Sequence, residues 1–321
     1  MTKFIIRRLL LFIPMLVIVT MVVFFFAWLA PGDALTGEIV DPSLPAEVLE
    51  QQRDLLGLND PFIVQYWNWL SNIVQGDLGQ SMSFNGRDVS DLILQRLDNT
   101  FYLGVFSLFI TLLFAIPIGI YSSRKKYSVL DYSATTFAFL GLATPNFFAA
   151  LLGIYLFSFT LGWLPTQGSM ASPSLTGWDA FVSRLHHLIL PGITLGLSST
   201  AVFLRYLRSE MLDLKGSDFI RTARAKGVGS NSVLYKHTLR NALIPIITLL
   251  GIEFGTILSG AIIIETVFGY PGIGTLFVSS LANRDYPVIM AINLIAAMTI
   301  LVGNLLADIC YAIADPRIRL D

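Results

Sequence analysis

Residues 9–30 read LLLFIPMLVIVTMVVFFFAWLA, a run of 22 residues without a charged side chain. A helix rises about 1.5 Å per residue and the hydrocarbon core of a bilayer is about 30 Å thick, so roughly 20 apolar residues cross it. The run is longer than the apolar core of a secretory signal peptide, which has roughly 7–15 residues. It therefore predicts a membrane-spanning helix.

Five further apolar runs of similar length follow along the chain. With the first, they fall within residues 9–30, 99–123, 132–159, 185–204, 241–264 and 286–307. Pro14, Pro117, Pro145 and Pro191 lie inside these runs, where neighbouring helices satisfy the carbonyl groups that a kinked helix frees. The sequence predicts an all-α membrane protein with six transmembrane helices.

The overall composition agrees with this class. Of the 321 residues, 54% are hydrophobic and only 13% are charged, whereas a soluble domain has about 25% charged residues. The formal net charge of -1 provides no basic excess for binding nucleic acid. One cysteine, Cys310, and three histidines exclude an intrachain disulfide and make an all-protein zinc site improbable. We expect no metal site and no catalytic residues.

The basic residues set the expected orientation, because Lys and Arg accumulate in cytoplasmic segments. With the N-terminus inside, the cytoplasmic segments contain most of them, including eight in residues 205–240. The short outer segments then contain only Arg184 and Arg284. Both termini are therefore expected in the cytoplasm. Residues 1–98 would form the first helix and an outer loop, and residues 99–321 a five-helix core with a cytoplasmic loop at about 205–240.

The outer loop that follows the first span is acidic. Residues 31–98 contain eleven Asp or Glu and three Arg. Val64, Trp67, Leu70 and Val74 recur at a helical spacing. These features predict a small outer subdomain, and the alternative is a solvated linker with aromatic side chains at the membrane interface.

The cytoplasmic loop contains the stretch SDFIRTARAKGVG at residues 217–229. Ser217 and Asp218 are expected to cap a short helix, and Gly227 to end it. A second helix is expected to start near residue 230. Two short helices joined at a glycine break form a rigid projection that can transmit motion to a soluble partner. Alternatively, the charges of this loop only set the topology and attract anionic lipid headgroups.

The sequence contains no phosphate-binding loop of the form G-x-x-x-x-G-K-[ST]. A chain without this loop has no nucleotide cradle of that type. The energy for any transport must then come from another chain or from an ion gradient.

Short motifs in a fixed order along nearly the whole chain point to one family. They are LAPGD at 29–33, LGLNDP at 56–61, VQYW at 64–67, GDLG at 76–79, RTARAKG at 221–227, HTLRNALIP at 237–245, ETVFGYPG at 265–272 and DPRIR at 315–319. As a set they resemble the membrane-spanning permease subunits of peptide-type ABC importers, a family that includes oligopeptide, dipeptide and nickel systems. The resemblance implies a permease of the type I importer kind.

In this family, the motif at residues 221–227 docks in a groove of the ATPase subunit. The family's general form is E-A-A-x-x-x-G, and with Gly227 on the glycine only Ala223 and Gly227 match it, whereas the peptide-type branch typically reads R-T-A-R-A-K-G. The resemblance implies ATPase contacts by a set of seven residues, in which the basic side chains pair with acids on the ATPase. The set is Asp218, Arg221, Thr222, Ala223, Arg224, Lys226 and Gly227.

The resemblance also implies the partners of the chain. A second, homologous permease would complete the translocation path, and two cytoplasmic ATPases would bind ATP and Mg²⁺, so that no cofactor binds to this chain. A solute-binding protein outside the cell would deliver the peptide. The chain would lie in the cell membrane of a prokaryote and perform no covalent chemistry, while ATP-driven closure of the ATPases would open the spans outward.

Glu253 is the acid that lies well inside an expected span. It is twelve residues past Asn241, which places it roughly 18 Å along the helix, near the middle of the membrane. An acid at that depth costs about 2.5–3.5 kcal/mol on insertion scales, so it should face water or a polar partner. We expect Glu253 to line the path with Thr256 and Gly260 and to attract the amino terminus of a peptide or a cationic substrate. The alternative is a glutamate that fixes helix packing.

Glu265 and Tyr270 lie at the outer end of the fifth span, next to a Gly-Tyr-Pro-Gly turn at residues 269–272. They are expected to form an outer gate, or alternatively a polar anchor for the outer loop.

The sequence is also compatible with three other functions. One is a gradient-driven transporter that uses Glu253 as a proton site. Another is ABC import of nickel or another small solute. An intramembrane hydrolase is weakly supported, because no Ser-His or paired-acid arrangement stands out within the spans.

Overall fold

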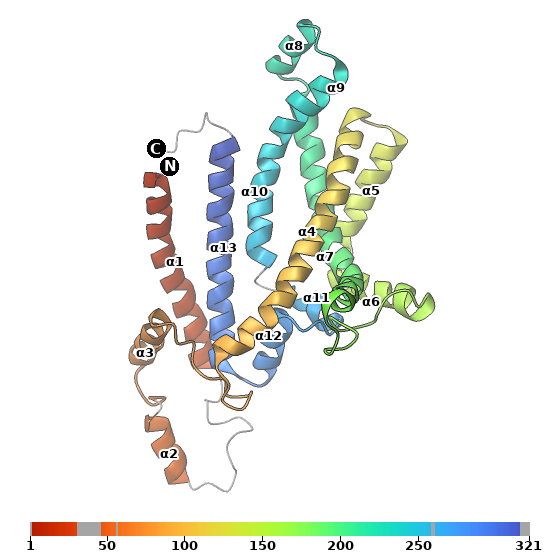
Figure 1. Cartoon of the computed structure of the whole chain (residues 1–321). Coiled ribbons are helices and arrows are strands. Elements are labelled where there is room, and N and C mark those ends of the chain that lie inside the picture. Colours follow the sequence, from red (N-terminus) through yellow and green to blue (C-terminus); the bar gives the residue numbers. More distant parts are fainter. Residues whose placement is uncertain (1, 31–45, 56, 258–260, 315–321) are drawn as a thin grey trace.

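The computed structural model describes residues 2–30, 46–55, 57–257 and 261–314. Its core is a bundle of long helices (Figure 1). These are α1 (Thr2–Leu29), α4 (Val89–Arg124), α5 (Val129–Ala143), α7 (Gly177–Leu214), α10 (Arg240–Ile257) and α13 (Tyr286–Ala314). Within the described ranges no strand is present, which agrees with the all-α prediction.

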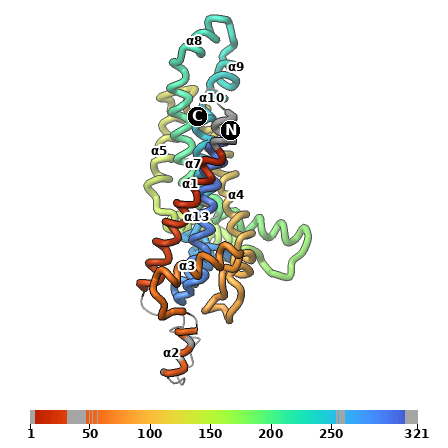
Figure 2. Tube along the Cα trace, turned by 90° about the vertical axis from the view of Figure 1, so that its left-hand side faces the viewer, coloured from red at the N-terminus to blue at the C-terminus, as the bar shows by residue number. Residues whose placement is uncertain are grey.

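Shorter helices lie at the ends of the bundle or extend from it. They are α2 (Ala46–Leu55), α3 (Phe62–Val74), α6 (Asn146–Gly153), η1 (Ile154–Thr160), α8 (Asp218–Ala225), α9 (Ser230–Ser232), η2 (Val233–Leu239), α11 (Ile262–Val267) and α12 (Ile273–Ala282). In Figures 1 and 2, α8 lies at one end of the bundle and α3 at the other. We call these the α8 end and the α3 end. The start of α1 and the end of α13 point to the α8 end, where Arg8 and Asp308 form an ion pair at 2.8 Å.

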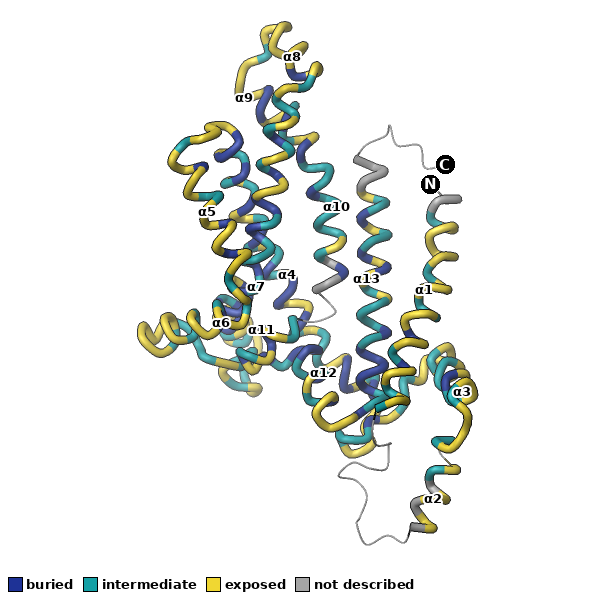
Figure 3. The backbone as a smooth tube through the Cα atoms, turned by 180° about the vertical axis from the view of Figure 1, so that it is seen from behind, coloured by how far each residue is buried: buried dark blue, intermediate teal, exposed yellow. Residues whose placement is uncertain are grey.

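Apolar side chains cover much of the outer surface of the bundle. In α1, Leu10, Ile18 and Phe26 are each more than 60% exposed, and Figure 3 shows exposed positions along most of this helix. A helix that is apolar on all sides and poorly buried in its own protein is suited to contact lipid. The expected membrane location is consistent with this surface.

Four described helices are long and apolar enough to cross a membrane, and they correspond to the first, second, fourth and sixth expected spans. They comprise Ile5–Leu29, Val89–Arg124, Gly177–Leu214 and Tyr286–Cys310. The fifth expected span corresponds to α10, but residues 258–260 within it lie outside the described part of the chain. The total of six spans and the cytoplasmic location of the termini stay predictions.

The third expected span is not one continuous helix. α5 ends at Ala143, and the following helical pair α6 and η1 is bent by 103° relative to it. Thr144 has φ -84° and ψ 119°, an extended conformation. This break follows from Pro145, because the proline ring disfavours the helical conformation of the residue before it. The proline expected inside this span therefore breaks the helix instead of only kinking it.

α10 and α13 pack with their backbones close together. A Cβ atom added to Gly251 would lie 2.3 Å from Cβ of Ala307, and one added to Gly255 would lie 2.9 Å from Cα of Ile300. Small residues allow membrane helices to approach in this way. The stripe of small residues in α10 therefore serves helix packing.

The helix predicted by the spacing around Trp67 is present as α3, and its buried side chain is Tyr66. Trp67 and Val74 are 67% and 80% exposed, whereas Tyr66 is buried against Phe24 of α1. The Tyr66 hydroxyl group lies 3.0 Å from Oγ1 of Thr20. α3 therefore packs the side that carries Tyr66 against the aromatic side chains of α1.

Candidate functional site

The projection predicted from residues 217–229 is present at the α8 end. α8 runs from Asp218 to Ala225, and Gly227 follows with a φ of +80°. The N–H of Gly227 donates to Arg224 O at 2.9 Å, and the N–H of Val228 donates to Ala223 O at 3.2 Å. These two bonds form a Schellman motif, in which glycine readily adopts the left-handed conformation. The helix stop predicted at Gly227 is confirmed.

An apolar contact fixes α8 against the helix that follows it. Ile220 and Ala223 are buried and pack against Val233 of η2 and against Val228. The contact between Ala223 and Val228 is the one that commonly accompanies a Schellman motif. Two short segments that could not be stable alone thereby support each other.

The opposite side of α8 is exposed and charged. Asp218 and Arg221 are 98% and 74% exposed and lie 3.5 Å apart. An exposed pair of this kind contributes little to stability, so its side chains are available to a partner. Six of the seven expected coupling residues are exposed, namely Asp218, Arg221, Thr222, Arg224, Lys226 and Gly227.

Two expectations about this segment differ from the structure. Ala223 is buried against Val233, so it stabilises the projection and is not accessible for contact with an ATPase in this conformation. Ser217 occupies the N-cap position of α8, but its hydroxyl group donates to Leu214 O at 2.6 Å and caps no N–H group of α8. The connection to α7 is short enough for Ser217 to reach the last turn of that helix.

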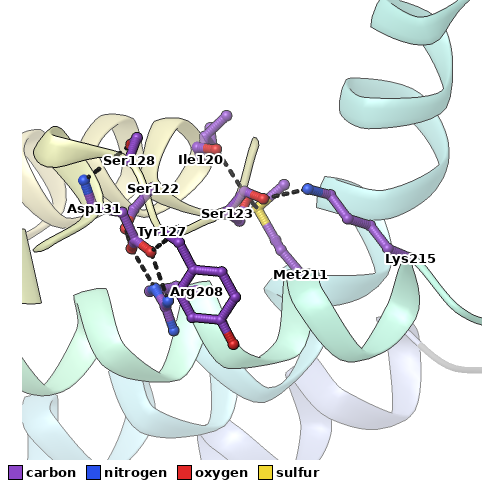
Figure 4. Close-up of polar contacts among 9 residues, drawn as sticks. All are labelled: Ile120, Ser122, Ser123, Tyr127, Ser128, Asp131, Arg208, Met211 and Lys215. Carbon is purple, nitrogen blue, oxygen red and sulfur yellow. Dashed lines mark hydrogen bonds and ion pairs between the residues drawn. The ribbon is translucent and has the colours of Figure 1, made fainter. Parts of the chain in front are cut away.

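A network of polar side chains lies below the projection, where α4, α5 and α7 meet (Figure 4). Its centre is Asp131, whose side chain is 3% exposed. Arg208 donates from Nε to Oδ1 at 2.6 Å and from Nη2 to Oδ2 at 2.8 Å. Ser122 donates to Oδ1, and the N–H of Tyr127 donates to Oδ2 at 2.9 Å. A two-pronged guanidinium contact with further donors is the arrangement that makes a buried ion pair favourable.

A second contact connects the end of α7 to the end of α4. The ammonium group of Lys215, directly after α7, donates to Ser123 O. The hydroxyl group of Ser123 donates to Ile120 O at 2.8 Å and lies 3.4 Å from the sulfur of Met211. Together with Asp131 and Arg208, these residues form what we call the polar joint. It connects the helix that precedes α8 to the hairpin of α4 and α5.

The polar joint was not predicted from the sequence. Asp131 follows Ser128 by three residues, and its N–H donates to the Ser128 hydroxyl group at 3.2 Å. That spacing is a helix-start signature and could have marked the beginning of α5. The pairing of Asp131 with Arg208 could not be inferred, because 77 residues separate them.

The expected path residues are described only in part. Glu253 on α10 is partly buried and accepts a hydrogen bond from Oγ of Ser199 on α7 at 2.6 Å. The acid therefore has a polar partner inside the bundle, as its depth requires. The side chain of Thr256 and the whole of Gly260 lie outside the described part of the chain. A role of these three in the path stays a prediction.

The expected gate residues are fully enclosed at the α3 end. Glu265 is inaccessible to solvent and accepts bonds from Thr100 Oγ1 at 2.8 Å and from the N–H of Gly274 at 2.7 Å. Tyr270 is buried as well, and its N–H donates to Glu265 O at 2.8 Å. In this conformation Glu265 is a polar anchor for the turn and for α12. A gating role for either residue stays a prediction.

Comparison with known proteins gives matches over almost the whole chain. A family model described as binding-protein-dependent transport system inner membrane component matches residues 115–320, and a model for the N-terminal part of such components matches residues 1–104. The oligopeptide transport system permease protein AppB of Bacillus subtilis is 47% identical over 319 residues, covering 99% of this chain and 100% of the relative.

Two further relatives cover both chains equally well. The glutathione transport system permease protein GsiC of Escherichia coli is 40% identical over 319 residues, or 99% of each chain. A putative peptide permease protein of Brucella suis is 40% identical over 322 residues, or 100% of each chain.

We predict that Arg208→Ala strongly destabilises the chain. The change leaves the carboxylate of Asp131 buried without its cation, and the loss of one partner of a buried pair costs about 3–5 kcal/mol. Thermal unfolding of the purified chain in detergent measures the effect. Arg205→Ala is the matched control, because Arg205 is exposed on the same helix and lies 5.9 Å from the Tyr206 ring, a contact worth about 1 kcal/mol at most. Equal melting temperatures for the two variants would contradict a stabilising polar joint.

Proposed function

The chain belongs to the family of binding-protein-dependent transport system inner membrane components, and from this premise we propose that α8 couples it to an ATPase that drives peptide import. It is a multi-pass membrane permease of the peptide-type ABC importers. This family consists of transport permeases and not of catalytic enzymes. In our proposal, two partner ATPases bind ATP and Mg²⁺, a second permease completes the path, and a solute-binding protein delivers the substrate.

The exposed face of α8 is the observation that carries this proposal. α8 projects beyond the long helices at one end of the bundle (Figure 1). Its apolar side is occupied by Val233, and its charged side, with Asp218 and Arg221, is exposed. A short helix that is fixed on one side and charged on the other is suited to dock on a partner with complementary charges.

The position of the chain ends supports a cytoplasmic location for α8. The start of α1 and the end of α13 lie at the α8 end. The loop at residues 205–240 has eight basic and three acidic residues, and basic loops remain in the cytoplasm. ATPases that use cytoplasmic ATP would approach the chain from this side.

The polar joint provides a route from α8 to the spans. A displacement of α8 is passed to the end of α7, which Arg208 and Lys215 connect to α4 and α5. Ion-paired and hydrogen-bonded contacts between helices transmit rigid-body motion. In this mechanism, closure of the ATPases moves α4, α5 and α7 together, and the path opens alternately to the two sides.

The names of the relatives favour a peptide-like substrate. They mention oligopeptide, peptide and glutathione transport. We infer that Glu253 contributes to selection within that class, because its carboxylate lies on α10 close to Ser199 of α7. A carboxylate at that position would attract the amino terminus or a basic side chain of a peptide.

Gly227→Val should uncouple transport. A non-glycine residue in the left-handed conformation costs roughly 1–2 kcal/mol, so the end of α8 should lose its geometry while the spans stay inserted. Uptake by the assembled transporter and co-purification of the ATPases measure the effect. Gly229→Val is the control, because Gly229 has a φ of -59° and an added Cβ meets nothing within 4 Å at either position. The same uptake in both variants would count against this coupling role.

Glu253→Gln should lower the uptake of cationic peptides more than that of neutral ones. Two charges about 4 Å apart at an effective dielectric of about 20 interact by about 4 kcal/mol, and even a third of that energy is about a tenfold effect. Uptake of a lysine-containing and a matched neutral peptide into vesicles measures the ratio.

Ser199→Ala separates the two explanations of Glu253, because it removes the hydrogen bond and retains the charge. If Glu253 only fixes helix packing, Ser199→Ala and Glu253→Gln should reduce assembly and should affect both peptides equally. That outcome would reject the charge role.

A further inference from the structure

A cleft with a free volume of about 180 Å³ lies between the polar joint and the projection. Three basic side chains line it, each from a different segment: Arg124 ends α4, Lys215 follows α7, and Arg224 lies on α8. The other lining residues are the polar Ser230, Asn231 and Thr238 and the apolar Val233 and Leu234. The fold thus brings together three cations that lie far apart in the sequence.

Lys215 donates to Ser123 O, but the cations of this cleft have no acidic partner in the described part of the chain. Burial, and then the nearby charge of Arg224, lower the pKa of the Lys215 ammonium group below its usual value. Cations that are held together without a counterion provide a favourable site for an anion.

The position of the cleft relative to the membrane indicates what the anion is. Arg124 and Lys215 stand at the ends of α4 and α7, two of the helices that can cross the membrane. Arg124 directly follows the expected span at residues 99–123, and basic pockets between helices at the edge of a membrane bind anionic headgroups.

We propose that the cleft of Arg124, Lys215 and Arg224 binds the phosphate of an anionic phospholipid in the leaflet at the α8 end. Guanidinium groups bind phosphate oxygens in pairs, and an ammonium group adds a third donor. The bound headgroup would neutralise the repulsion between the projection and the ends of α4 and α7. It would thereby hold α8 against the polar joint.

The test uses the full-length chain in detergent, delipidated and then titrated with phosphatidylglycerol or phosphatidylcholine. Native mass spectrometry measures the bound lipid. We expect one phosphatidylglycerol to bind more tightly than phosphatidylcholine. Each basic residue near a headgroup contributes about 1 kcal/mol, so Arg124→Gln and Lys215→Gln should each weaken this binding about fivefold. Arg124 is exposed, so its variant tests the site even if Lys215→Gln folds poorly.

Lys126→Gln is the matched control. It removes the same charge two residues from Arg124, but Lys126 does not line the cleft and lies 4.7 Å from the centre of the Tyr127 ring. Its affinity for phosphatidylglycerol should equal that of the unmodified chain. If all three variants bind phosphatidylglycerol equally weakly, the lipid is attracted by diffuse surface charge and the proposal is overturned.

Two further outcomes would overturn the lipid assignment. If inorganic phosphate binds as tightly as phosphatidylglycerol and displaces it, the cleft recognises free phosphate and the rest of the lipid contributes nothing. If Arg124→Gln and Lys215→Gln retain the lipid but lose co-purifying ATPase, the cleft receives an acidic segment of that partner. Retention of the lipid in the presence of phosphate, and its loss in the two cleft variants, would support the proposal.

Discussion

The carboxylate of Asp131 is the group on which the α8 end of the bundle depends. It is buried where three helices meet, with only 3% of its side chain exposed. The bidentate contact with Arg208 and the donors from Ser122 and Tyr127 compensate for this. Because a buried charge is tolerated only with such partners, the position of α7 relative to α4 and α5 is fixed at this point. α8 follows directly from α7, so its direction is fixed as well.

Buried carboxylates have the same role at the α3 end. Glu265 receives bonds from Thr100 and from the backbone of α12. Asp285 receives bonds from Ser81 Oγ and from the N–H of Ser83, about 200 residues earlier in the chain. Both ends are therefore held by polar contacts, while apolar packing dominates between them. We expect the helices of such a bundle to move together as rigid bodies and not by local bending.

Two parts of the fold that depend on local sequence were predicted correctly. Four spans followed from runs of apolar residues, and the end of α8 followed from Gly227, because bilayer thickness and backbone conformation act on consecutive residues. The size of the bend at Pro145 and the side of α3 that packs on α1 were not predicted, because each depends on the helices alongside. The polar joint was not predicted at all. Its partners come together only when α4, α5 and α7 are assembled, and no spacing in the sequence connects Asp131 to Arg208.

Cross-linking in the assembled transporter can show whether α8 is the point at which an ATPase acts on this permease. In a Cys310→Ser background, which removes the single cysteine of the sequence, Thr222→Cys places a thiol on the exposed side of α8. Trp178→Cys places one at the start of α7, at the opposite end of the bundle, where the native side chain is 74% exposed. We expect a short bifunctional reagent to join the ATPase to Thr222→Cys and not to Trp178→Cys. A cross-link from Trp178→Cys alone would contradict this expectation.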